Sequence, residues 1–223
     1  MVPETLAKGG ESAGARDAKL ASICHMRPLP DAREQLELAL RTANGHFVYE
    51  SGHHGDLWID LQKLLAHTPH MRAWASEIAR LSYAQRPEVV CGPLVGGAFV
   101  SQFVASELGL PCVFSERISD EDSRFRVPPS LRTLVEGGRV LLLDDAINAG
   151  AACRSTARDL REAGATVVAL AALVELGDDG TRLGGEFGIP FHVLARRERQ
   201  LWRPDSCPLC KRGTPLSFEL MRG

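Results

Sequence analysis

Unbroken hydrophobic runs recur along the chain, and amphipathic segments separate them. A run without polar alternation is typical of a strand that is covered on both faces, as in a parallel sheet. Such runs predict strands at 88–93, 111–115, 140–143, 166–176 and 190–194. Helical periodicity between them predicts helices over 70–85, 99–108, 154–163 and 182–187. We therefore predict an α/β fold, a parallel sheet flanked by helices, with its ligand at the carboxyl ends of the strands.

The N-terminal third follows a different pattern. Residues 1–27 are rich in alanine, glycine, serine and charge and have little periodicity, so we expect a poorly ordered tail. From Asp31, a plausible N-cap, the pattern becomes helical, and this helix should end near residues 44–45. Two short alternating runs within 47–61 flank a Ser-Gly-His-His-Gly turn, which indicates a hairpin.

One long segment lacks any periodicity. Residues 118–138 are polar, irregular and interrupted by Pro128 and Pro129. A loop of this length in a compact domain is usually functional or mobile. Arg117 precedes it, and within it the basic residues are Arg124, Arg126 and Arg132.

Composition excludes several classes of protein. The 223 residues are 44% hydrophobic and 24% charged, which suits one folded domain with appendages. A net charge of −2 gives no basic surface for nucleic acid. No apolar run approaches the ~20 residues of a membrane helix, and the N-terminus lacks the apolar core of a signal peptide. Cys91, Cys112 and Cys153 fit buried thiols, so we expect a cytoplasmic protein without membrane or nucleic-acid partners.

The segment 139–164 carries the candidate chemistry. Its apolar run ends in Asp144 and Asp145, a small-residue turn follows at 148–152, and an amphipathic helix follows the turn. Close backbone N–H groups and a helix N-terminus favour phosphate. Two adjacent acids would repel phosphate alone, but they suit a ligand that also carries hydroxyl groups or a divalent cation. A sugar phosphate meets both requirements.

This segment resembles the signature of the type I phosphoribosyltransferases, which bind phosphoribosyl pyrophosphate (PRPP). The resemblance implies that Asp144 and Asp145 hold the ribose hydroxyls and, indirectly, Mg²⁺. It also implies that the 5′-phosphate lies on the loop Asn148, Ala149, Gly150, Ala151 and Ala152. Asn148 stands where threonine is commoner, and Ala151 stands where serine or threonine is frequent. The backbone donors survive both changes.

Two further stretches are similar to the orotate phosphoribosyltransferases. The hairpin around residues 45–62 resembles their N-terminal hood, which covers the base. Gly92-Pro93 and Gly97 match their pyrophosphate loop, and the resemblance implies that Leu94, Val95 and Gly96 bind the pyrophosphate. Close packing of a helix on a strand would also require glycine here. Segment 118–138 corresponds to the catalytic loop, which in the family often closes across a dimer interface. The resemblance thus implies a homodimer.

The resemblance also divides the chain. We expect a tail at 1–27, a phosphoribosyltransferase-like domain with its hood at 28–200, and a C-terminal extension at 201–223.

The departures that remove a basic residue all concern the pyrophosphate. Glu50 stands where the hood usually has a basic residue, the loop after Pro93 has no lysine, and segment 118–138 has neither lysine nor histidine. Departure of pyrophosphate depends on electrostatic stabilisation, so Arg117, Arg124 and Arg126 are the candidate replacements.

Two functions therefore stay open. The first is a Mg²⁺-dependent transferase that moves ribose 5-phosphate from PRPP to a nitrogenous base, most simply orotate. The alternative is a non-catalytic sensor of PRPP or a nucleotide on the same fold. A generic nucleotide-binding protein has less support, because the chain has no GxGxxG motif and no Walker lysine.

Two histidines and two cysteines suggest metal chemistry without establishing it. His53 and His54 are adjacent on a predicted strand and point to opposite faces, so we interpret them as exposed turn histidines. Cys207 and Cys210 look like half of a zinc knuckle, but structural zinc requires four ligands. Cys24, His25 or a second subunit could complete the set, and ordinary reduced cysteines are the simpler interpretation.

Overall fold

A computed structural model of the chain describes residues 32–49, 52–66, 68–119, 122 and 124–217. Several expectations concern residues outside these ranges, namely the tail at 1–27, the N-cap at Asp31, the hood residue Glu50, and Cys24 and His25 as metal ligands.

The largest element is a six-stranded sheet with the order β5-β4-β3-β6-β7-β8. All its strands are parallel except β5, which pairs antiparallel with β4. This confirms the predicted α/β fold with a mostly parallel sheet. The strands are β3 (Val89–Pro93), β4 (Cys112–Arg117), β5 (Phe125–Arg126), β6 (Arg139–Ile147), β7 (Thr166–Leu176) and β8 (Phe191–Arg197).

Helices cover both faces of this sheet, and each face has its own core. On one face lie α2 (Ala32–Ala39), α4 (Thr68–Ser82) and α5 (Gly96–Leu108). On the other lie α6 (Arg132–Val135), α7 (Ala151–Glu162) and α8 (Asp179–Phe187). Along β7, Ala171 and Leu173 join the first core while Leu170 and Ala172 join the second. A strand buried on both faces has no polar positions to alternate, which explains its unbroken apolar sequence.

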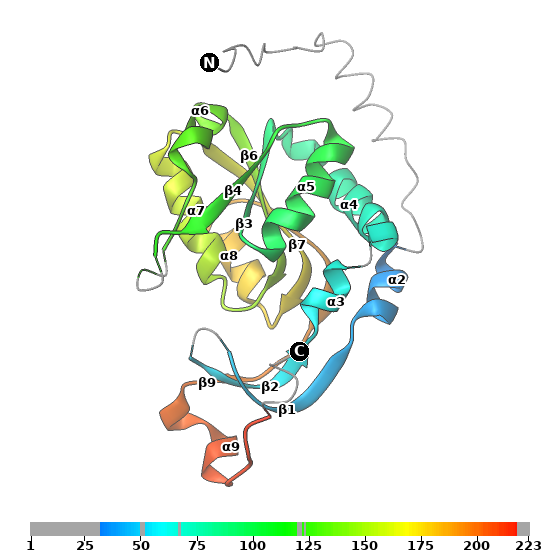
Figure 1. Ribbon diagram of the computed structural model, residues 1–223, viewed down its shortest axis with the longest axis vertical. Helices are drawn as coiled ribbons and strands as arrows, with labels where there is room; N and C mark the ends of the chain where they lie inside the picture. The colour runs from blue at the N-terminus through cyan, green and yellow to red at the C-terminus, as the bar shows by residue number, and fades with distance from the viewer. Residues whose placement is uncertain (1–31, 50–51, 67, 120–121, 123, 218–223) are drawn as a thin grey trace, which may run out of the picture.

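The hood is a separate three-stranded sheet with the order β1-β2-β9. β1 (Thr42–Val48) and β2 (His54–Ile59) form the predicted hairpin, and β9 (Leu201–Trp202) pairs antiparallel with β2. The short helix α3 (Leu61–Leu65) leads from the hood to α4. Figure 1 shows the hood at the end of the molecule toward which β3 and β6 run, with α9 (Pro208–Lys211) beyond it. Part of the C-terminal extension is therefore built into the hood.

The first helix is shorter than predicted. It ends at Ala39 instead of near residues 44–45, and β1 begins at Thr42. Residues 42–44 pair with residues 57–59 of β2. The segment that was predicted as the end of the helix therefore forms a strand. Tertiary pairing thus overrides local helix propensity at this boundary.

The expectation of one irregular loop over 118–138 is wrong. This segment contains β5, the 3₁₀ turn η2 (Pro129–Leu131) and α6. The side chains of Phe125 and Val127 are buried, and the backbone N–H of each donates a hydrogen bond to α7, to Ser155 Oγ and Asp159 Oδ2 respectively, both at 2.7 Å. The segment is therefore fastened to the fold along much of its length.

Within the described residues, no helix is long and apolar enough to cross a membrane.

Candidate functional site

The two adjacent acids lie within the central strand β6. β6 runs beyond the predicted apolar stretch to Ile147, so it carries Asp144 and Asp145 to the carboxyl edge of the sheet. Both residues are half-buried. The backbone N–H of Asp145 donates to Asp144 Oδ1 at 3.0 Å, and that of Ala146 donates to Asp145 Oδ1 at 2.8 Å. Cys153 Sγ donates to Asp144 Oδ2 at 3.4 Å. These bonds fix the orientation of both carboxyl groups.

The surroundings of the pair disfavour two negative charges. Burial raises the pKa of Asp144 well above its ordinary value, and the neighbouring charge of Asp145 raises it further. Burial also raises the pKa of Asp145. Among the described residues, the groups that shift these two pKa values include no lysine or arginine. A ligand that brings a cation or several hydroxyl donors would satisfy these carboxylates better than the protein itself does.

A glycine loop from the neighbouring strand touches both acids. Gly96 and Gly97 follow β3, and a Cβ atom on Gly97 would lie 2.6 Å from Asp144 Oδ1. A Cβ atom on Gly96 would overlap Asp145 Oδ2. Only glycine permits this approach. The two segments chosen separately from the sequence, 94–97 and 144–145, therefore meet at one place, where Leu94 and Val95 are exposed and joined by a cis peptide bond.

The small-residue turn after β6 leads directly into α7. Gly150 is the N-cap with φ +68°, and α7 begins at Ala151. No side chain caps this helix, so its first N–H groups have no side-chain acceptor. The Oδ1 atom of Asn148 is buried and has no hydrogen-bond partner. The uncapped backbone N–H groups at the start of α7 are donors that suit an anion.

The three candidate arginines lie on the β4–β5 hairpin. Arg124 forms an exposed ion pair with Asp122 at 2.6 Å and lowers the pKa of that carboxyl to about 2. Arg126 Nε lies 3.9 Å from Glu116 Oε1. The guanidinium of Arg117 stacks 5.7 Å from the ring centre of Phe125. The structure therefore gives each arginine a contact within the hairpin.

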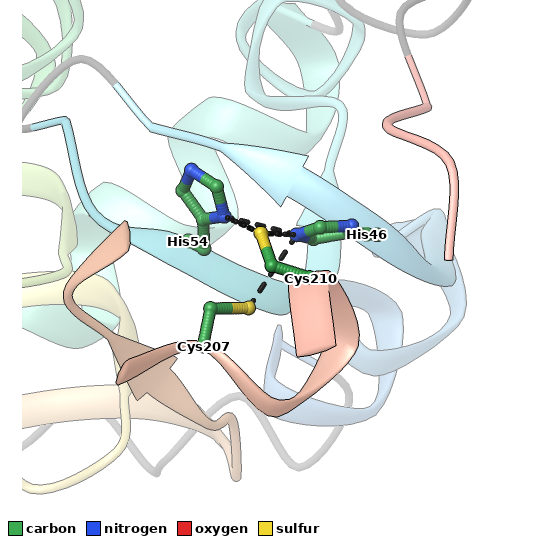
Figure 2. A group of neighbouring side chains, drawn as sticks. All are labelled: His46, His54, Cys207 and Cys210. Carbon is green, nitrogen blue, oxygen red and sulfur yellow. Dashed lines mark hydrogen bonds between the residues drawn. The ribbon is translucent and has the colours of Figure 1, made fainter. Parts of the chain in front are cut away.

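The cysteine pair of the extension lies against the hood, beside two histidines (Figure 2). These are His46 of β1 and His54 of β2, which are 1% and 8% exposed. The interpretation of His54 as an exposed turn histidine is therefore wrong, since strand pairing buries it. His46 was not among the predicted site residues, although its place on one face of the hairpin with His54 was a usable signal.

Comparisons with known proteins agree with this fold. A family model described as the phosphoribosyl transferase domain matches residues 60–184. The orotate phosphoribosyltransferase of Heliobacterium modesticaldum is 32% identical over 176 residues, 77% of this chain and 86% of that protein.

Solved structures share the architecture at lower identity. The adenine phosphoribosyltransferase of Thermoanaerobacter pseudethanolicus has a TM-score of 0.61 and 17% identity, covering 74% of this chain and 99% of its own. The Mycobacterium tuberculosis orotate phosphoribosyltransferase in complex with PRPP has a TM-score of 0.58 and 19% identity, covering 75% and 96%. The fold is thus that of the type I phosphoribosyltransferases. The chain belongs to the phosphoribosyltransferase family, a glycosyltransferase class of enzymes.

Proposed function

We propose that this protein is a Mg²⁺-dependent phosphoribosyltransferase that transfers ribose 5-phosphate from PRPP to a ring nitrogen of a base and releases pyrophosphate. One observation carries the proposal: the acid pair of β6 and the glycine loop after β3 meet at the carboxyl edge of the sheet. Orotate is the first candidate base, because the curated relatives bear the name orotate phosphoribosyltransferase. The adenine phosphoribosyltransferases among the structural neighbours make a purine the second choice.

The acid pair has a clear task in this reaction. Asp144 and Asp145 would accept hydrogen bonds from the ribose hydroxyls and hold the sugar while positive charge develops at its anomeric carbon. When bound, Mg²⁺ supplies positive charge that neutralises the departing pyrophosphate. No covalent nucleophile is required.

Two backbone loops would hold the two phosphate ends of PRPP. The 5′-phosphate would lie on residues 148–152, where the uncapped start of α7 offers N–H donors. The pyrophosphate would lie on residues 94–96, beside the acids. The close approach of Gly96 to Asp145 supports this placement, because it brings a ligand on the loop within reach of the carboxylates.

The arginines are the available cations for the leaving group. Loop 94–97 has no lysine, and Arg117, Arg124 and Arg126 lie on the neighbouring hairpin. The Arg124–Asp122 pair is exposed, and such pairs contribute only about 0–1 kcal/mol. Arg124 could therefore exchange its partner for a phosphate at little cost.

The alternative function is a sensor that binds PRPP or a nucleotide without turnover. The missing lysines favour it, since they weaken stabilisation of pyrophosphate more than recognition of the sugar phosphate. A homodimer and a cytoplasmic location are further parts of our proposal. The homodimer rests on the family resemblance, and the location rests on the composition of the sequence. Measuring the molar mass in solution tests the first.

The decisive experiment measures pyrophosphate release from PRPP and Mg²⁺ with a panel of bases, orotate first, together with calorimetric binding of PRPP. Turnover with orotate supports the transferase and shows that the missing lysines are dispensable. Tight binding without turnover on any base identifies the sensor. Absence of binding to PRPP and to nucleotides contradicts both proposals.

A further inference from the structure

Four side chains of metal-ligand type meet where the C-terminal extension joins the hood. They are His46 from β1, His54 from β2, and Cys207 and Cys210 from the start and middle of the α9 turn. Their ligand atoms all lie within 4.8 Å of one another. Figure 2 shows the two imidazoles and the two thiols converging on one point. The acid pair of β6 has no part in this group.

The distances match those of a single tetrahedral ion. His46 Nε2 lies 2.9 Å from His54 Nδ1, and Cys210 Sγ lies 3.2 Å from His54 Nδ1. Cys207 Sγ and Cys210 Sγ lie 3.5 and 3.7 Å from His46 Nε2. Zinc bonds of about 2.0–2.3 Å in tetrahedral geometry imply separations of about 3.3–3.8 Å between ligand atoms. Three of these four distances lie inside that range or within about 0.1 Å of it, and the two nitrogens would need to separate slightly. The other two of the six separations, both from Cys207 Sγ, are at most 4.8 Å.

The register of the β1–β2 hairpin brings His46 and His54 to one face of the hood. Val48 pairs with His54, and the register shifts between Asn44 and Phe47, so that His46 sits in a β-bulge. Residues two apart on a strand share a face, and His46 therefore lies on the same face as Val48 and its partner His54. The rings contact edge to face with centroids 5.0 Å apart.

The extension places the cysteines by strand pairing. His54 pairs with Trp202, the last residue of β9, and Cys207 follows five residues later in the sequence. Cys207 directly precedes α9, and Cys210 follows within the same turn. A Cys-x-x-Cys pair at the start of a helical turn brings both sulfurs to one side, as in zinc knuckles. Cys207 is fully buried in this position.

A second contact fixes which nitrogen of His46 faces the cluster. His46 Nδ1 lies 2.8 Å from the carbonyl oxygen of Thr214, so this nitrogen carries the proton and donates it. Nε2 then presents its lone pair to Cys207, Cys210 and His54. A carbonyl acceptor on the outer nitrogen is the usual support of a metal-bound histidine.

We propose that these four residues bind one structural Zn²⁺ that fastens the C-terminal extension to the hood. Two thiolates and two imidazoles form a closed tetrahedral set with no position left for water, as in structural zinc sites. Thiolate and imidazole ligands exclude Mg²⁺, which prefers oxygen. A two-iron cluster would bind the histidines and cysteines on different irons, whereas here both kinds of ligand surround one point. The site completes itself within one chain, with no need for Cys24, His25 or a second subunit.

The first test is the metal content of the full-length protein, purified without chelator or affinity metal and measured by plasma mass spectrometry. We expect about one zinc per chain, as this four-ligand set requires. Cys210→Ser and His54→Gln should each lose most of this zinc. Two matched controls should retain it: Cys112→Ser, a half-buried thiol in β4, and His53→Gln, the neighbour of His54 outside the cluster.

A second test does not depend on folding of the variants. The wild-type protein with its zinc exchanged for Co²⁺ should show the charge-transfer and ligand-field absorption of tetrahedral cobalt with thiolate ligands. A chelator should lower its melting temperature, and added Zn²⁺ should restore it. Wild-type protein that contains no zinc, takes up neither ion and melts unchanged in chelator overturns the proposal, and the cluster is then a hydrogen-bonded histidine pair beside two thiols.

Discussion

The acid pair of β6 shows how a binding residue can oppose stability. Asp144 and Asp145 are adjacent, half-buried carboxyl groups whose pKa values are raised by burial. Such a group favours the folded state only while it is protonated. The ligand-free protein therefore has an electrostatic cost at the place where our proposed ligand would bring hydroxyl donors and a cation.

This cost predicts a pH dependence for Asp144. Because its folded pKa is raised, its favourable contribution is complete below the pKa of the unfolded chain and is lost as the pH rises through the folded value. Asp144→Asn removes that loss, so the ligand-free variant should melt higher than the wild type at pH 8 and about equally at pH 4. Each kcal/mol gained corresponds to about 2–4 °C for a domain of this size. Thermal unfolding across this pH range checks the prediction, and a variant that melts lower at pH 8 contradicts it.

Asp145 should matter for the ligand more than for the fold. Asp145→Asn removes a charged acceptor of hydrogen bonds, and each such bond contributes about 1.5–3 kcal/mol. PRPP binding should weaken at least about tenfold for each bond lost, while the melting temperature stays the same or rises slightly, because burial raises the pKa of Asp145 as well. Calorimetry with PRPP and Mg²⁺ measures the affinity. Asp178→Asn, an exposed acid before α8, serves as the control. Unchanged affinity in Asp145→Asn would contradict the ribose assignment.

Gly96 should tolerate no side chain. In Gly96→Ala the new Cβ overlaps Asp145 Oδ2, so either the loop or the carboxylate must move. We expect PRPP affinity to fall at least about tenfold, because the two halves of the proposed site separate. Gly185→Ala in α8 is the matched control, since its Cβ would meet no atom within 4 Å. Equal affinity in both variants would show that the loop does not contact the ligand.

At the scale of elements, the sequence predicts those strands and helices that have a clear local periodicity. β7 and the apolar part of β6 were predicted because a strand covered on both faces has an unbroken apolar sequence. The acid pair follows that apolar part within β6, and the turn at 148–152 follows the strand, so their place at the carboxyl edge was predicted with it. The convergence of the acids with Gly96 and Gly97 was implied only by family resemblance, since no local pattern reports contacts between loops.

The elements that were missed depend on partners far along the chain. β5 has two residues, too few for periodicity, and it is held by Ser155 and Asp159 of α7. His54 looked exposed because its burial is due partly to β9 and the following turn, which lie about 150 residues later in the sequence. Burial that distant segments create cannot be predicted from a local pattern.

Asp159 should hold the β5–α6 segment in place. Its carboxylate accepts from the N–H of Val127 at 2.7 Å and pairs with Arg132. Asp159→Ala leaves a buried N–H without its acceptor, which costs about 1–3 kcal/mol. Hydrogen exchange should accelerate over residues 124–135 while β6 and β7 stay protected. The exposed Glu162→Ala in the same helix should leave exchange unchanged. Equal protection in Asp159→Ala would mean that apolar packing alone holds the segment.

At the scale of the molecule, the hood shares one core with the main sheet through Leu57 and Ile59 of β2, but its third strand comes from the C-terminal extension. The main sheet has two large cores, whereas the hood is a small sheet that depends on β9 for its third strand. Deleting residues 201–223 should therefore leave the main sheet folded but destabilise the remaining two strands of the hood. We expect faster hydrogen exchange in β1 and β2 with unchanged protection in β6 and β7. Loss of protection in both sheets would instead show that the hood and the main sheet unfold as one unit.

The pairing of β2 with β9 also has a consequence for the order of folding. The two strands are made far apart in time, because all the parallel strands lie between them in the sequence. Contacts of such long sequence separation form late, since the intervening chain must first be organised. During synthesis the main sheet can assemble while β2 still presents an unpaired edge, and such edges attract other strands. A stalled ribosome would thus hold a chain whose main sheet is folded and whose β2 edge is still unpaired. We expect chaperones that bind extended strands to recognise this edge.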